Sequence, residues 1–204
     1  NLLKLKNKNL IEISYRQAKN SNIFKKIILS SDSDHIIDTG NKLGFDLVIK
    51  RPNYLARDKS GKVDAIKHAL LESEKYFNKT FKNIFDLDVT SPLRSIVDIK
   101  NFLKIFKKKK ANNLITVCEA RKNPYFNMIQ KIKDKIKVVA SRREYKSRQT
   151  APKVYEMNAS IYIWSRDALL KKSMFNPKTI FYKMPISRSI DIDSEFDFKI
   201  VKFI

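Results

Sequence analysis

The chain is poor in the residues that build cross-linked, flexible or membrane-spanning proteins. Its 204 residues include one cysteine, three glycines and six prolines. A single thiol excludes an intrachain disulfide framework, and Cys118 lies inside an apolar run, which indicates a reduced core residue of a cytosolic protein. No run of about 18 apolar residues is present, so we expect no membrane span. The N-terminal residues also lack the pattern of a signal peptide.

Acidic residues are scarce as well. Lys and Arg number 43 against 21 Asp and Glu, which gives a formal net charge of +22. Such an excess suits a polyanion such as nucleic acid, or an anionic small substrate. The lysines are scattered over many segments, however, and no zinc-finger spacing or glycine-rich RNA-binding signature accompanies them. We favour a bias of composition, and a basic nucleic-acid-binding α/β module stays open as an alternative.

The hydrophobic pattern predicts strands that alternate with helices. Hydrophobic residues make up 43% of the chain, enough for the core of a single domain over residues 1–204. Strands are expected at residues 25–30, 46–49, 81–89 and 113–118, and helices at 10–18, 35–43, 63–77 and 96–106. This alternation favours an α/β fold with a doubly wound, Rossmann-like, mostly parallel sheet.

The character of the chain changes after residue 119. Strands are expected at residues 125–130, 135–140 and 160–164 with few helices between them, followed by a helix at 165–171, a strand at 179–183 and a closing helix at 194–203. We interpret residues 120–160 as a β-rich arm within the domain, used for dimerisation.

The stretch at residues 85–94 is the first candidate for chemistry. Asp86 and Asp88 lie two apart at the end of an apolar strand, so their side chains share one face. Such a pair is costly unless a positive group lies beside it. Ser95 and Asp98 form a capping box for the next helix. A strand, a polar turn and a capped helix are how α/β folds place chemistry, which makes Asp88 the leading candidate.

A second acidic pair lies near the end of the chain. Asp191 and Asp193 alternate with Ile190 and Ile192, so both carboxylates face the same way. Oxygen ligands of this kind suit Mg²⁺, which binds through one or two carboxylates and completes its shell with water and phosphates. The plainer alternative is that these residues decorate a strand end and that Asp193 or Ser194 caps the last helix.

Other candidates are weaker taken singly. Arg51, fixed by the following proline, presents a guanidinium that suits carbonyls and phosphates. Arg148 can clamp a carboxylate, and Asn158 and Tyr162 can bond hydroxyls or amides, although for these residues taken alone a surface arm and an ordinary strand are the preferred explanation. Nucleophile elbows, dinucleotide loops and Walker lysine loops are absent from the sequence.

Together these stretches resemble the acylneuraminate cytidylyltransferase family, the CMP-sialic acid synthetases, over essentially the whole chain. The resemblance rests on residues 25–34 (KKIILSSDSD), Arg51-Pro52 with Leu55-Ala56, residues 90–94 (TSPLR), residues 158–162 (NASIY) and residues 189–195 (SIDIDSE). Residues 86–89 and 155–158 look more like the branch that activates legionaminic acid or related nonulosonic acids.

The resemblance implies a three-layer nucleotidyltransferase fold and a cytoplasmic homodimer. It implies Mg²⁺-dependent transfer of CMP from CTP to a nine-carbon α-keto acid sugar, with release of pyrophosphate, for cell-surface glycans or flagellin glycosylation. By this match the catalytic residues are Asp88, Asp191 and Asp193, the metal ligands are Asp191 and Asp193, the nucleotide is met by Asn1, Arg51 and Asp88, and the sugar is met by Arg148, Gln149, Asn158 and Tyr162.

The chain departs from the family pattern in two ways. Phe126 stands where sialic acid enzymes have a substrate-contacting lysine, so the sugar's substituents are expected to differ. Asn1 matches the last residue of a phosphate-binding loop, and we expect the chain as given to lack that loop and to bind CTP poorly. An inactive synthetase remnant and a synthetase for an eight-carbon sugar acid are the remaining alternatives.

Overall fold

A four-stranded mixed sheet lies at the centre of the molecule. The computed structural model describes residues 2–57, 59–140, 145–171 and 173–204. The sheet has the order β10-β6-β9-β5. Its strands are β5 (Asn83–Leu87), β6 (Asn113–Glu119), β9 (Tyr155–Ser165) and β10 (Thr179–Lys183). β10 pairs with β6 in parallel, whereas β9 lies between β5 and β6 and runs antiparallel to both.

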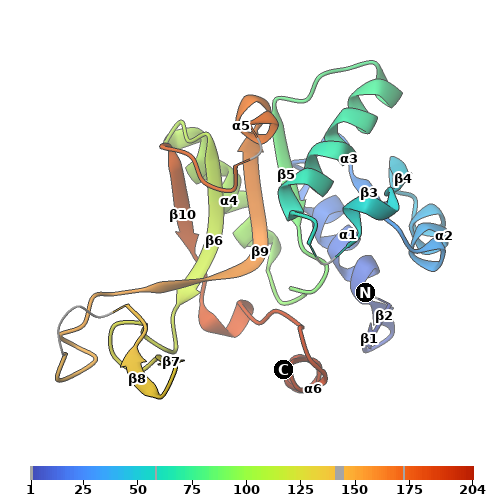
Figure 1. Ribbon diagram of the computed structural model, residues 1–204. Helices are drawn as coiled ribbons and strands as arrows, with labels where there is room; N and C mark the ends of the chain where they lie inside the picture. Colours follow the sequence, from blue (N-terminus) through green and yellow to red (C-terminus); the bar gives the residue numbers. More distant parts are fainter. Residues whose placement is uncertain (1, 58, 141–144, 172) are drawn as a thin grey trace.

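Helices cover both faces of this sheet, as Figure 1 shows. Alternate residues of β6 and β9 point to opposite faces. Ile115, Val117 and Trp164 pack against α3 (Lys62–Phe77) and α5 (Arg166–Leu170). Leu114, Ile161 and Ile163 pack against α4 (Ile96–Lys108). Because β6 is buried on both faces, its sequence is a nearly continuous apolar run, which is what made this strand predictable.

A second, smaller sheet is formed by β3 (Ile28–Ser31) and β4 (Leu47–Lys50), which run parallel. They are joined by α2 (Asp34–Leu43). As the sequence predicts, α2 ends at Gly44, whose φ of +81° is a left-handed conformation that glycine adopts at little cost. The chain therefore turns at once into β4.

The remaining elements flank these sheets. They are the hairpin β1 (Lys4–Leu5) and β2 (Lys8–Asn9), α1 (Leu10–Ser21), η1 (Asn53–Leu55), the hairpin β7 (Ile129–Ile132) and β8 (Lys135–Val138), η2 (Ile186–Arg188) and α6 (Glu195–Phe203). In Figure 1 the β7–β8 hairpin projects from the body at the far end of β6 and β9. Among the described residues, no helix is long and apolar enough to cross a membrane.

The predicted α/β order is confirmed. The expected mostly parallel sheet is corrected to a mixed one, because one pairing of the four-stranded sheet is parallel and two are antiparallel. Two predicted strands also need correction. A strand at residues 125–130 is wrong for its first half, because the Asn123 carbonyl accepts the amides of Phe126, Asn127 and Met128 and closes a turn. The strand predicted from Ser160 begins earlier, at Tyr155, because beyond a bulge between Ile115 and Val117 its pairing resumes and runs to Glu119, opposite Tyr155.

Candidate active site

The acidic pair at the end of β5 meets a lysine. Lys62, the first residue of α3, places its Nζ 2.9 Å from Asp86 Oδ2 and 2.6 Å from Asp88 Oδ2. The same ammonium lies 4.5 Å from the centroid of the Tyr162 ring. The prediction that both carboxylates share a face beside a positive group is therefore confirmed. The sequence did not single out Lys62, since its only local signal is a position at the start of a helix.

The lysine controls the charge of this pair. Burial acts to raise the pKa of Asp88, but the Lys62 ammonium and hydrogen bonds from Thr90 outweigh it and hold that pKa below its ordinary value. Burial likewise acts to lower the pKa of Lys62, and the charges of Asp86 and Asp88 raise it instead. Asp88 and Lys62 are therefore both ionised at neutral pH.

Asp191 lies against the turn that follows β5. The Ser91 hydroxyl is 3.4 Å from its Oδ1, and the Ile192 amide donates to the Thr90 carbonyl at 3.0 Å. The pKa of Asp191 is raised by burial, and by the negative charges of Asp88 and Asp193. Asp88, from the middle of the chain, and Asp193, from near its end, thus both lie close enough to Asp191 to repel its negative charge.

The donor set at this point fits Mg²⁺. Among the described residues no group of three or more His, Cys, Asp or Glu side chains has the arrangement of a complete protein-only metal site. Asp191 and Asp193 supply the one or two carboxylates that Mg²⁺ takes when water and phosphates fill its other positions. Burial first, and then the charges of Asp88 and Asp193, raise the pKa of Asp191, and a bound cation would act against both effects. Ser194 caps α6 together with Asp197, so the cap does not require Asp193.

A buried arginine holds the turn in place. Arg94 is 2% exposed and donates to the carbonyls of Asp88 at 2.5 Å and Ser160 at 2.6 Å. It also donates to Ser14 Oγ at 2.7 Å, on α1. Burial lowers the pKa of Arg94 to about 10, against the opposing effect of Asp88, Asp86 and Asp191. Arg94 is therefore part of the framework behind the carboxylates.

A second ion pair anchors the segment that carries Asp191. Asp98 forms the predicted capping box with Ser95 at the start of α4. The same carboxylate accepts two bonds from Arg188, at 2.8 Å from Nε and 2.9 Å from Nη2. Since Arg188 lies three residues before Asp191, this pair ties the end of the chain to the helix that follows the TSPLR turn.

Asn158 and Tyr162 lie behind the acidic cluster and are buried. Asn158 Nδ2 donates to Ser189 Oγ at 2.8 Å. The residue after it, Ala159, has a φ of +52°, at the bulge in β9. Tyr162 stacks on Trp164 with ring centroids 5.5 Å apart. Both residues thus support the site from within the sheet, and their contacts with a sugar stay a prediction.

The other predicted binding residues lie on separate elements. Arg51 follows β4, and its Nη2 pairs with Asp32 Oδ1 at 2.7 Å, while its buried Nε has no hydrogen-bond partner in the described part of the chain. Arg148 and Gln149 are exposed in the arm, where Arg148 donates to the Arg121 carbonyl at 3.3 Å. Asn1 lies outside the described residues.

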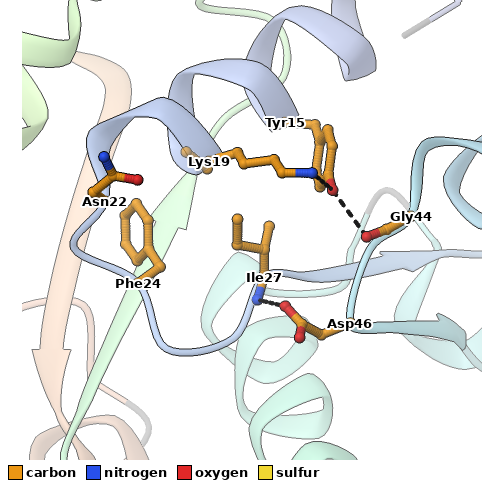
Figure 2. Close-up of a pocket in the computed structure, with 8 residues that line it drawn as sticks. Tyr15, Lys19, Asn22, Phe24, Ile27, Gly44 and Asp46 are labelled. Atoms are coloured by element: carbon orange, nitrogen blue, oxygen red, sulfur yellow. Dashed lines mark hydrogen bonds between the residues drawn. The ribbon is translucent and has the colours of Figure 1, made fainter.

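A cavity of about 400 Å³ lies elsewhere, between the end of α1 and the starts of β3 and β4. Figure 2 shows Tyr15 reaching across it to the Gly44 carbonyl, at 2.9 Å. Ile27 and Asp46, which line it, precede the two parallel strands, whereas Arg51 follows them. The cavity therefore lies at the amino-terminal ends of β3 and β4, whereas Arg51 lies at their carboxyl-terminal ends, and we do not assign the cavity to the site.

Comparison with known proteins gives the family. The chain matches the family model described as Cytidylyltransferase over residues 1–200. It is 42% identical over 205 residues to a "Post-translational flagellin modification protein B" of Campylobacter coli. It is 43% identical over 205 residues to a "CMP-N,N'-diacetyllegionaminic acid synthase" of Campylobacter jejuni. Each match covers 100% of this chain and 87% of the relative.

Solved structures agree on the fold. A CMP:2-keto-3-deoxy-manno-octonic acid synthetase complexed with CTP has a TM-score of 0.66 at 13% identity, covering 99% of this chain and 89% of that one. A 4-diphosphocytidyl-2C-methyl-D-erythritol synthase has a TM-score of 0.70 at 10% identity, covering 99% and 92%. The chain therefore belongs to the cytidylyltransferase family and has the α/β nucleotidyltransferase fold.

Proposed function

We propose that this protein transfers CMP from CTP to a nonulosonic acid of the legionaminic or sialic type and releases pyrophosphate. The names of its relatives support this substrate class, since they include a CMP-N,N'-diacetyllegionaminic acid synthase and a flagellin modification protein. The observation that carries the proposal is the arrangement of the carboxylates, since Asp191 packs against the turn that follows Asp88, whose Oδ2 is held by Lys62 at 2.6 Å. We infer that the product serves cell-surface glycans or flagellin glycosylation.

In this proposal Asp191 and Asp193 hold Mg²⁺. The bound ion supplies neutralisation of negative charge on the transferred phosphate and on the leaving pyrophosphate. Asp88 lies beside the nucleotide ribose and the sugar. Because Lys62 and Thr90 lower its pKa, Asp88 is a weak base at neutral pH, so we assign it the orientation of hydroxyl groups rather than proton removal.

The remaining contacts follow from the same resemblance. Arg51 is assigned to the cytosine, and its Nε has no hydrogen-bond partner in the described part of the chain. Arg148 and Gln149 are assigned to the sugar, with Arg148 at its carboxylate. Asn158 and Tyr162 are assigned to the inner wall of the sugar pocket. Asn1 is assigned to the nucleotide.

We also infer a homodimer built through the arm at residues 120–160. The β7–β8 hairpin exposes large apolar side chains, with Ile129 65% exposed and Ile136 68% exposed. An exposed apolar ribbon of this kind is typical of a surface that pairs with another chain. We infer that the exposed Arg148, which belongs to the same arm, lies near the partner copy. The single, unpaired Cys118 suits a cytoplasmic location.

The metal assignment is tested by Asp193→Ala, assayed by pyrophosphate release from CTP and a legionaminic-type acid with Mg²⁺, on the protein at its natural length. We expect turnover to fall by at least about a hundredfold, because one of two metal carboxylates is removed, with an unchanged circular dichroism spectrum. Asp38→Ala, an exposed carboxylate on α2, serves as the matched control and is expected to retain activity. Near-normal turnover by Asp193→Ala would show that the metal is held elsewhere.

The sugar is tested by the same assay with a panel of acids. Nine-carbon α-keto acids are expected to be turned over and the eight-carbon acid to be poor. A preference for the eight-carbon acid would identify the protein as a synthetase for an eight-carbon sugar acid instead. Salt-sensitive binding of nucleic acid without turnover of any sugar would favour the basic binding module.

A further inference from the structure

The carboxylates at the site divide into two pairs with different partners. Asp86 and Asp88, at the end of β5, share the ammonium of Lys62 at 2.9 and 2.6 Å. Asp191 and Asp193 come from the segment before α6. The Ser91 hydroxyl is 3.4 Å from Asp191 Oδ1, and in the described part of the chain neither Asp191 nor Asp193 forms an ion pair. One internal cation therefore neutralises the first pair much more than the second.

The oxygens of Asp88 are already engaged. Oδ2 accepts from Lys62 at 2.6 Å. Oδ1 accepts from the Thr90 hydroxyl at 2.9 Å and from the Thr90 amide at 3.2 Å. A carboxylate held at both oxygens is fixed in direction and would have to give up a charge-assisted hydrogen bond before it coordinated a metal.

The position of Lys62 is set by the core. It begins α3, and Val63, the next residue, is 8% exposed in the cluster beneath the sheet. The Tyr162 ring, stacked on Trp164, lies 4.5 Å from its Nζ. Strand β5, helix α3 and strand β9 thus hold the ammonium from three sides, so it behaves as a built-in cation.

We propose that Lys62 is a positioning residue that holds Asp88 out of the metal's ligand set, so that the divalent ion is held by Asp191 and Asp193 alone. This inference rests on the proposed function, since it takes Asp191 and Asp193 as the metal ligands. It would explain why a divalent ion is offered only two carboxylates, although Asp88 lies at the turn against which Asp191 packs. Without the ammonium, Asp88 becomes available as a third ligand.

The test measures binding of Mn²⁺, as a probe of the divalent site, by electron paramagnetic resonance without nucleotide. Lys62→Met is expected to lower the dissociation constant by about tenfold, because ligand charge and number set the affinity of such sites. Lys75→Met, an exposed lysine near the end of the same helix, is the matched control and is expected to match the unaltered protein. An unchanged constant in Lys62→Met would overturn the proposal.

Two double variants separate ligation from net charge. Lys62→Met with Asp86→Asn and Lys62→Met with Asp88→Asn both restore the original net charge. The tighter binding is expected to persist in the first and to vanish in the second, because only Asp88 becomes a ligand. Loss of the gain in both variants would show a simple charge effect and sink the proposal.

Single variants keep the test valid if Lys62→Met fails to fold. Asp88→Asn alone is expected to leave Mn²⁺ affinity within about twofold of the unaltered protein, since Asp88 is not a ligand there. A large loss would contradict the inference about Lys62. Asp193→Ala is expected to lose Mn²⁺ binding, and retention of binding would instead contradict the proposed metal ligands.

Discussion

At the scale of single residues, the site stores electrostatic repulsion. Asp191 is the clearest case, because burial and the neighbouring negative charges both raise its pKa. A raised pKa of an acid means that its ionised form destabilises the folded state. That cost is fully present above the folded-state pKa, declines as the pH falls below it, and is gone below the lower unfolded-state pKa. A binding site tuned for a cation is therefore expected to weaken the protein when the cation is absent.

Asp191→Asn tests whether the charge of Asp191 lowers the stability of the protein when no cation is bound. In EDTA at neutral pH we expect the free energy of unfolding to rise by about 1 kcal/mol, since the substitution removes a charge from a repulsive cluster. Urea denaturation measures the change. Added Mg²⁺ is expected to stabilise the unaltered protein and to leave the variant unaffected. A variant that is less stable than the unaltered protein in EDTA would show that the carboxylate is needed for the fold.

At the scale of elements, the capped start of α4 organises the site. Two capping boxes occur in the described chain, Ser95 with Asp98 and Ser194 with Asp197. Only in the first box does the carboxylate, that of Asp98, also bind an arginine, Arg188. Asp98 is fully buried. We infer that the first box has a second task, which is to anchor the segment that carries Asp191.

Asp98→Asn separates these tasks. The change leaves Arg188 without its charged partner. Because Arg188 is about one-third exposed, we expect the free energy of unfolding to fall by about 2 kcal/mol, less than the cost of breaking a fully buried pair. Turnover is expected to fall with it, because the segment that carries Asp191 loses its anchor. The control is Asp197→Asn, which breaks a similar box on the surface and is expected to cost less and to leave turnover nearly intact. Equal effects on turnover would refute the anchoring role.

Some of these features can be read from the sequence and others cannot. The shared face of Asp86 and Asp88, the need for a positive neighbour, and the Ser95–Asp98 box follow from local spacing. Lys62 does not, because it lies 26 residues from Asp88 and only the packing of α3 brings them together. The bulge at Ala159 also escapes prediction, since a positive φ at alanine is imposed by the sheet around it.

At the scale of the whole molecule, the alternation of strands and helices was predictable because β6 and β9 carry strong apolar patterns. The antiparallel direction of β9 was not, since a strand's sequence does not record its direction. The projecting hairpin was foreseen as a β-rich arm, although its first strand begins at Ile129 rather than at residue 125. Sequence thus captured the layers of the molecule better than the places where strands bend or turn.

The dimer inferred from the arm is tested by placing charge on it. Ile129→Asp combined with Ile136→Asp is expected to shift the sedimentation of the protein from dimer to monomer, because both side chains are largely exposed on the hairpin. Turnover is expected to fall as the dimer is lost. Val97→Asp, at another exposed apolar position, is the control and is expected to keep the dimer. A double variant that still sediments as a dimer would exclude the hairpin as the interface.

The contacts of Arg94 have a consequence for how the protein loses activity. Its guanidinium joins groups 80 and 66 residues away in the chain, Ser14 on α1 and Ser160 on β9, to the end of β5. Pairings this distant form late and open only when large parts of the structure open together. The carboxylate cluster therefore forms only when the whole domain is folded. We expect a partly folded or proteolytically nicked chain to be inactive. As denaturant is added, we therefore expect activity to be lost in the same cooperative transition in which the amides of β5 and β9 lose their protection from hydrogen exchange.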